Sequence, residues 1–306
     1  MNDLFLVFTS SLTTLAICIA VGFFCRKRQM INDTHTAGMT DLLIKVVIPC
    51  AIFMSLMRPF TRALLFESIA TFFIAGIIFF LGGYLGLALA RMLKASPSER
   101  MSWRFGVTFG NVGFMGIPVV MAVFGYEGLF YVGMVNAAFN LLTFTIGIRM
   151  FGSKEKINPW QMLKQNPALV GTMIGFVFFL TGLRLPGPVE DGVALFAGMN
   201  SPLSMFLIGV LLAKVPLKET FTDIRVLPPN AAKLIVIPLA SLLVLRPFVH
   251  NPVMLGVIVT LMAMPPGATT AIFAEQFTGE SAAATRFVMV GTILCVITVP
   301  LVSLLL

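Results

Sequence analysis

Residues 110–118 read Gly110-Asn111-Val112-Gly113-Phe114-Met115-Gly116-Ile117-Pro118 and interrupt a long apolar run near its middle. Glycine tolerates an unwound backbone, and proline removes a backbone donor and clashes with the preceding helical turn. A second interruption, Ala263-Met264-Pro265-Pro266-Gly267-Ala268-Thr269-Thr270, lies in an apolar run of the other half of the chain. Together the two stretches predict a pair of helices that are each broken inside a membrane.

The composition favours a lipid bilayer as the surroundings of this chain. Of its 306 residues, 58% are hydrophobic and 11% are charged, whereas a soluble domain carries about 25% charged residues. Apolar segments near the length of about 20 residues that crosses a bilayer recur along the whole sequence. The predicted spans are 4–24, 41–58, 66–90, 103–124, 128–149, 167–183, 192–213, 230–248, 251–274 and 285–306. We therefore predict an all-α, polytopic, multi-pass membrane protein with ten transmembrane helices.

The distribution of basic residues predicts the orientation. Sixteen of the 21 lysines and arginines, Lys233 among them, are assigned to odd-numbered loops, and only four to even-numbered loops. Because cytoplasmic loops attract positive charge, the odd loops should be cytoplasmic and both termini extracytoplasmic. Lys45 is then the only basic residue clearly within a span, and its side chain is expected to snorkel to the interface. The net charge of +8 reflects this topology, so nucleic acid is not an expected partner.

The ten spans divide into two related halves. Residues 1–150 and 167–306 each contain five spans, joined by a short cytoplasmic connector at 151–166. The interrupted helices are the fourth and the ninth, so each is the fourth helix of its half. Because five is an odd number, the second half enters the membrane from the opposite side, which predicts an inverted 5+5 repeat. Corresponding interrupted spans in two inverted halves indicate the substrate site of a secondary transporter.

The predicted site uses helix ends and uncharged side chains. Pro118 and Pro266 are each expected to begin a half-helix, whose N-terminus carries about half a positive charge. Two such ends meeting at the midplane would bind an anion, although the carbonyl ends of the preceding half-helices could equally hold a cation. The alternative for each interruption is an ordinary kink. The candidate substrate-binding residues are Asn111, Gly110, Gly113, Gly116, Pro118, Pro265, Pro266, Gly267, Thr269, Thr270, Asn136, Asn140 and Ser55.

Two of these candidates have a second interpretation. Asn136 and Asn140 are four residues apart, which places them on one face of a helix. Such a pair contacts substrate or makes a hydrogen bond to a neighbouring helix, and the sequence weights both roles equally. Asn111 is the stronger candidate because it lies inside the first interruption.

The sequence argues against catalysis and against a bound metal. An intramembrane enzyme needs a nucleophile, a metal cluster or an acid–base pair, and the chain has no HExxH, no GxSxG and no carboxylate in the middle of a span. Its four cysteines lack CxxC spacing, and two histidines cannot form a metal cluster. We expect no catalytic residues, no metal and no cofactor. A gated channel remains an alternative to a carrier.

The interruptions also carry a resemblance to a known family. Residues 110–118, the Met264-Pro265-Pro266-Gly267-Ala268 stretch and residues 292–302 resemble the auxin efflux carrier family, above all its bacterial malonate-transporter-like members. The resemblance implies a ten-helix inverted-repeat fold, shared with bile-acid/sodium symporters, in which the broken fourth and ninth helices cross. It also implies elevator-type transport of a small organic anion such as malonate, with Asn111 among the substrate contacts. A bacterial inner membrane and a homodimer are further implications of the resemblance.

The alternative within transporters is a sodium-coupled symporter of a larger, bile-acid-like amphipathic anion. The resemblance places an acidic residue at the ion site of the sodium-coupled relatives, near the helix crossing. This chain has no acidic residue beside Pro265 and Pro266. Sodium coupling is therefore not carried over from those relatives.

Overall fold

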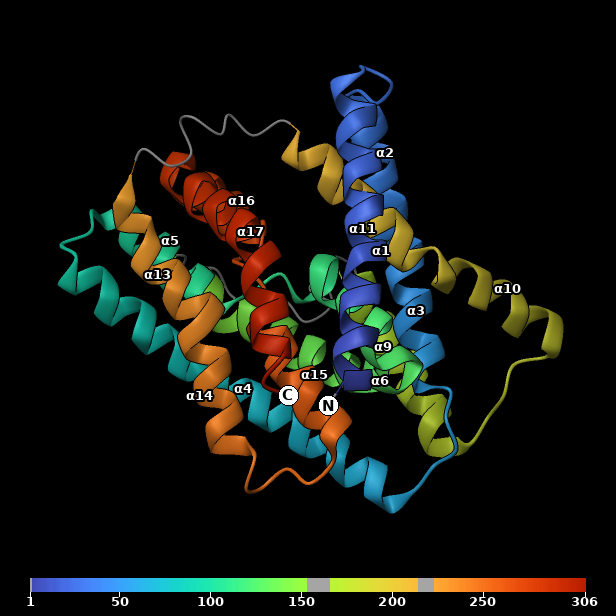
Figure 1. The fold of residues 1–306 in the computed structure, drawn as a ribbon. Coiled ribbons are helices and arrows are strands. Elements are labelled where there is room, and N and C mark those ends of the chain that lie inside the picture. Colours follow the sequence, from blue (N-terminus) through green and yellow to red (C-terminus); the bar gives the residue numbers. More distant parts are fainter. Residues whose placement is uncertain (1, 153–165, 214–222) are drawn as a thin grey trace. The chain divides into compact units, whose positions relative to one another are not determined.

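The computed structural model describes residues 2–152, 166–213 and 223–306 (Figure 1). The described residues form helices and no β-strand. Six of their helical segments are long and apolar enough to cross a membrane: Asp33–Leu56, Arg62–Met92, Val112–Met150, Gly187–Leu212, Ile224–Leu245 and Ala282–Ser303. The predicted all-helical membrane protein is therefore confirmed, while the ten-helix inverted repeat stays a prediction.

The chain forms two compact units, and each of them draws on both halves of the sequence. The first unit comprises residues 1–70, 113–137 and 159–215, and the second comprises 71–112, 138–158 and 216–306. The predicted boundaries at 150 and 167 stay predictions. Most of the predicted connector, residues 153–165, lies outside the described residues.

The first unit is built mainly from the opening helices of each half. It contains α1 (Asn2–Lys27), α2 (Asp33–Leu42), the π-helical segment η1 (Leu43–Val47), α3 (Ile48–Leu56), α9 (Pro167–Thr181), α10 (Gly187–Gly198) and α11 (Asn200–Leu212). It also holds the start of α4 (Arg62–Met92) and most of α6 (Ile117–Leu142). Gly125 has φ +60° and ψ −155°, a left-handed conformation that divides α6 into two helical pieces.

Glycines allow the helix backbones of the first unit to touch. A Cβ on Gly22 of α1 would lie inside the van der Waals radius of the Phe206 carbonyl oxygen of α11. A Cβ on Gly209 of α11 would do the same at the Ile19 carbonyl of α1. The hydrophobic effect does not drive helices together in lipid. Small residues at such crossings stabilise the contact through close van der Waals packing instead. The α1–α11 contact (Figure 1) therefore depends on both glycines.

The second unit contains the later helices of each half. They are α5 (Pro97–Thr108), η3 (Thr143–Gly147), α7 (Ile148–Met150), η4 (Ile224–Val226), α13 (Leu227–Ala231), η5 (Ala232–Val236), α14 (Ile237–Leu245), α15 (Pro252–Met262), α16 (Thr269–Thr278) and α17 (Ala282–Ser303). The remaining part of α4 and the end of α6 also belong to it. The segment η2 (Val112–Gly116) begins at the division between the two units.

Three of the π-helical segments in the described chain share a sequence cause. The segments η1, η2 and η5 are each followed directly by Ile-Pro, at Pro49, Pro118 and Pro238. Proline has no N–H and its ring clashes with the carbonyl four residues earlier, and a widened turn relieves that clash. The prediction that Pro118 begins a half-helix is therefore wrong, because helical backbone already resumes at Val112.

An ion-pair cluster ties three elements of the second unit together. Glu99 closes a capping box with Ser96 at the start of α5 and accepts a 2.8 Å hydrogen bond from Arg225. Arg225 also binds Asp223 at 3.1 Å, and Arg286 of α17 lies 3.7 Å from Asp223. The hydrogen bond from the Arg225 side chain lowers the pKa of the Asp223 carboxyl below its usual value. The cluster is therefore sensitive to acid.

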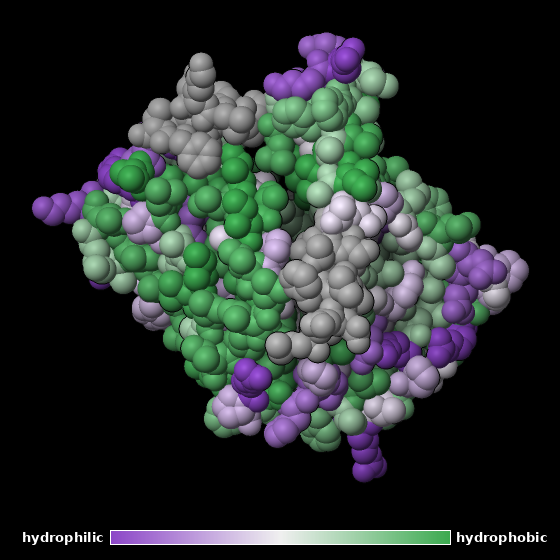
Figure 2. All heavy atoms as spheres, viewed as in Figure 1, coloured by the Kyte–Doolittle hydropathy of each residue, from purple (hydrophilic) through white to green (hydrophobic). Residues whose placement is uncertain are grey.

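The outward faces of several helices in the second unit are apolar. Leu243 and Phe248, in and after α14, are each 75% exposed, and Ile297 of α17 is 65% exposed. Figure 2 shows this apolar surface over α14 and α17. Large exposed apolar surfaces of this kind mark contact with lipid or with other protein.

The α1–α11 contact gives a first test. Gly209→Ala places a methyl group against the Ile19 carbonyl, and overpacking of this kind costs about 1–3 kcal/mol. We expect the melting temperature of the purified protein to fall by about 2–4 °C or more. Gly192→Ala in α10, where a Cβ meets nothing within 4 Å, is the control and should leave the melting temperature unchanged or raise it. Equal melting temperatures of the two variants would show that the contact is looser than described.

The acid-sensitive cluster gives a second test. Because the folded-state pKa of Asp223 is lowered, its stabilising contribution is complete above the unfolded value of about 4 and is lost as the pH falls through the folded value. Asp223→Asn should therefore lower the melting temperature at pH 7, and the difference from wild type should shrink as the pH falls below about 4. The exposed Asp191 of α10 provides the control variant, Asp191→Asn. A difference that stays constant between pH 7 and pH 3 would contradict this role of Asp223.

Candidate functional site

The two interrupted segments pair with each other inside the second unit. Residues 109–111 follow α5, and residues 263–268 separate α15 from α16. Gly110 and Pro266 form an isolated antiparallel bridge. The Asn111 N–H donates to the Pro265 carbonyl at 2.7 Å, and the Gly267 N–H donates to the Phe109 carbonyl at 3.2 Å. Non-helical backbone at membrane depth needs partners within the protein, and here each segment supplies them to the other.

The pairing depends on residues without side chains. A Cβ on Gly110 would lie 3.0 Å from the Met264 carbonyl oxygen. A Cβ on Gly106 of α5 would lie 3.1 Å from Pro266 Cβ, and one on Gly291 of α17 would lie 2.6 Å from Pro266 Cδ. Pro266 is thus enclosed by two glycines, which explains why small residues flank the bridge on both neighbouring helices.

The second interruption ends at the N-terminus of α16. The helix begins at Thr269, three residues after Pro266, so the prediction that Pro266 is the first residue of the half-helix is wrong. An N–H group of its first turn has its carbonyl acceptor in the interruption itself, because the Thr270 N–H donates to the Gly267 carbonyl at 2.9 Å. The positive end of a ten-residue helix therefore lies directly beside the bridge.

The predicted site residues fall into two groups. The structure brings Gly110, Asn111, Pro265, Pro266, Gly267, Thr269 and Thr270 together in the second unit, where Asn140 also belongs. It assigns Gly113, Gly116, Pro118, Asn136 and Ser55 to the first unit. The hydroxyls of Thr269 and Thr270 are buried and have no hydrogen-bond partner. The Ser55 hydroxyl donates to the Ile52 carbonyl of its own helix at 2.6 Å.

The asparagine pair on α6 keeps both of its interpretations. Asn136 and Asn140 are both buried, and they lie in the helical piece after Gly125. The division between the two units falls between them. Whether they contact substrate or a neighbouring helix stays a prediction.

Two polar residues beside the bridge were not among the sequence candidates. Lys233 of η5 is fully buried, and its Nζ lies 3.0 Å from the position of a Gly110 Cβ. Asn230 of α13 is also fully buried, and its Nδ2 donates to the carbonyls of Val226 and Phe287. The assignment of Lys233 to a cytoplasmic loop was therefore wrong, because the residue lies inside the helical segment Ile224–Leu245.

A signal for Lys233 was present in the sequence. The residue falls within the predicted span 230–248, and Lys233-Leu-Ile-Val-Ile-Pro238 parallels Lys45-Val-Val-Ile-Pro49 of the first half. The two lysines nevertheless differ in environment. Lys45 is exposed and pairs with Asp41 at 2.7 Å, as expected for a side chain that reaches the interface.

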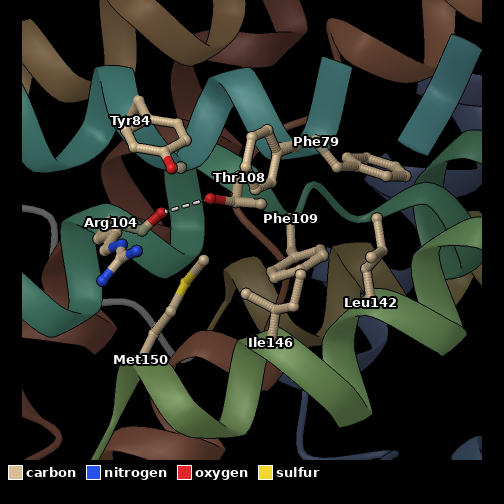
Figure 3. Close-up of a pocket in the computed structure, with 10 residues that line it drawn as sticks. Phe79, Tyr84, Arg104, Thr108, Phe109, Leu142, Ile146 and Met150 are labelled. Carbon is tan, nitrogen blue, oxygen red and sulfur yellow. Dashed lines mark hydrogen bonds between the residues drawn. The ribbon is translucent and has the colours of Figure 1, made fainter. Parts of the chain in front are cut away.

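A small pocket in the second unit adjoins the first interruption. Its lining includes Phe79 and Tyr84 of α4, Arg104 and Phe109 at the end of α5, and Met150 of α7 (Figure 3). The Thr108 hydroxyl donates to the Arg104 carbonyl at 2.7 Å, as the dashed line shows. Most of the lining is apolar, so this pocket suits an apolar group better than a small anion.

The comparisons with known proteins agree with a role in transport. A family model described as "Membrane transport protein" matches residues 6–165 and 156–303. The chain is 23% identical over 312 residues to "Uncharacterized transporter YfdV" of Escherichia coli K12, with 96% of each chain covered. It is 24% identical over 233 residues to "Putative malonate transporter" of Rhizobium meliloti, covering 73% of this chain and 71% of that protein.

The bridge gives a third test. Gly110→Ala introduces a methyl group 3.0 Å from both the Lys233 amine and the Met264 carbonyl oxygen, so these neighbours must shift by a few tenths of an ångström. Overpacking of this kind costs about 1–3 kcal/mol, and we expect the melting temperature to fall by about 2 °C or more. Thermal unfolding of the purified protein measures this change. Gly38→Ala on the exposed face of α2 is the control, and equal melting temperatures of the two variants would show that the bridge accepts a side chain at residue 110.

Proposed function

Because the chain belongs to the membrane transport protein family, the auxin efflux carriers, we propose that it is a secondary transporter of a small organic anion such as malonate or another carboxylate. The family match extends over nearly the whole sequence, and the relatives are named as transporters. Membrane transport and a position within a lipid bilayer follow from family membership. The substrate and the mechanism are our proposal.

The observation that carries the proposal is the backbone pairing of the two interrupted segments. Pairing through Gly110, Asn111, Pro265 and Gly267 uses only main-chain groups. The N-terminus of α16 starts beside that pairing, and helix N-termini favour anions through their partial positive charge. An anion bound there would be held by peptide dipoles and by neutral side chains such as Asn111, Thr269 and Thr270.

We propose an elevator type of alternating access for the transport cycle. The division of the chain into two compact units supports such a mechanism, since transport would then move one unit relative to the other. A position in the bacterial inner membrane, extracytoplasmic termini and a homodimer belong to the same proposal. They rest on the charge distribution of the sequence and on the family resemblance.

Counterflow in proteoliposomes tests the proposed function. Vesicles loaded with unlabelled malonate should accumulate labelled malonate when they contain the protein, and protein-free vesicles should not. Asn111→Ala removes one side-chain amide from the interruption, and loss of one hydrogen bond to a charged ligand should raise the half-saturating malonate concentration about tenfold or more. Transport should proceed equally in sodium and potassium buffers.

Three results would count against parts of this proposal. Accumulation that requires sodium would favour a sodium-coupled symporter. Unchanged kinetics of Asn111→Ala would remove Asn111 from the substrate site. Single-channel currents in a planar bilayer, in place of saturable counterflow, would identify a channel.

A further inference from the structure

Lys233 is a buried basic residue for which the proposed function has so far given no role. Its side chain is 0% exposed, and its Nζ has no hydrogen-bond partner. The ion pairs found among the described residues do not include it. An ionised group in the protein interior is costly unless it is paired and hydrogen-bonded, so a lysine in this position requires an explanation.

The Lys233 side chain faces the paired segments. Its Cε and Nζ both lie 3.0 Å from the position that a Gly110 Cβ would occupy, and the Met264 carbonyl oxygen is equally close to that position. Gly110 is itself the bridge residue. The end of the lysine side chain therefore occupies the space beside the bridge that the missing side chain of Gly110 leaves open.

A second polar group reaches the bridge from the same stretch of chain. The Oδ1 atom of Asn230 is buried without a hydrogen-bond partner. Both this atom and Pro266 Cδ lie against the position of a Cβ on Gly291. Asn230 and Lys233 are three residues apart, so α13 and η5 together direct two buried polar side chains toward the bridge.

Most of the buried groups around the bridge that lack a partner are able to donate a hydrogen bond. Besides the Lys233 amine, the buried hydroxyls of Thr269 and Thr270 have no partner, and the α16 N-terminus adds its partial positive charge. An ammonium group, two hydroxyls and a helix N-terminus complement an anion and not a metal cation. A carboxylate would satisfy them through charge-assisted hydrogen bonds, which are among the stronger ones in proteins.

We propose that Lys233 is a substrate-binding residue whose ammonium group pairs with a carboxylate of the transported anion beside Gly110. This inference rests on the proposed function and names the charged contact of the same site. It changes the site from one made only of dipoles and neutral side chains to one with a full positive charge. The partner that the amine lacks within the protein is then the substrate.

The proposal makes opposite predictions for binding and for stability. Lys233→Met keeps the unbranched side chain up to the position of Cε and removes the amine with its charge. The ligand-free variant should therefore have a higher melting temperature than wild type, because a buried polar group without a partner has been removed. The same variant should bind malonate about 10- to 100-fold more weakly, because the charge-assisted contact is lost.

The experiment compares wild type, Lys233→Met and the control Lys45→Met by titration with malonate and by thermal unfolding. Lys45 is also a lysine within an apolar helical segment, but it is exposed and paired with Asp41. Its replacement should leave malonate affinity unchanged. Malonamide, which has the shape of malonate without its charges, should not distinguish wild type from Lys233→Met.

Each contrary result identifies what is wrong. If wild type transports malonate and Lys233→Met binds it with unchanged affinity, the role of Lys233 is wrong and the proposed function stands. If Lys233→Met lowers the melting temperature of the ligand-free protein, the lysine is structural and the inference is overturned. If wild type neither binds nor transports malonate, succinate or lactate, the proposed function fails, and the role of Lys233 fails with it.

Discussion

A lipid bilayer offers no hydrogen bonds to the backbone, so each unwound peptide group within it must be satisfied by the protein. In this chain two unwound segments satisfy one another. The Asn111 and Gly267 amides donate to the Pro265 and Phe109 carbonyls, across a bridge between Gly110 and Pro266. Each interrupted segment therefore depends on the other for its backbone hydrogen-bond partners. Glycines at 106, 110 and 291 supply the space that so close an approach needs.

Buried side-chain groups without a hydrogen-bond partner surround this mutual pairing. The main chain holds the two segments together, and the Lys233 amine and the Thr269 and Thr270 hydroxyls around them have no partner. The α16 N-terminus contributes the same sign of charge. The small anion that we propose as substrate would satisfy all of them, and the chain belongs to a family of membrane transport proteins.

The sequence was sufficient for the coarse architecture and for the interruptions. Composition and span length predicted an all-helical membrane protein, and the glycines and prolines predicted where the spans 103–124 and 251–274 are unwound. The positions of the half-helix starts were wrong, because proline was interpreted only as a helix initiator. At Pro118 it widens a continuing helix, and at Pro266 it lies in the bridge itself.

Lys233 shows a different limit of the sequence. A charge near the edge of an apolar span resembles a loop residue or a snorkelling side chain, and only packing decides between a surface and a core position. Lys45 and Lys233 precede similar Ile-Pro motifs, yet one is exposed and paired with Asp41 and the other is fully buried. The difference arises from contacts between segments far apart in sequence, here 110, 233 and 264. Periodicity and composition do not contain that information.

The most direct test of the account is a crystal structure of the protein with bromomalonate, located by the anomalous scattering of bromine. The account predicts a bromine peak beside the Gly110–Pro266 bridge, with a carboxylate oxygen within hydrogen-bond distance of the Lys233 amine. A bromomalonate bound elsewhere while the bridge and Lys233 remain without a ligand would contradict it.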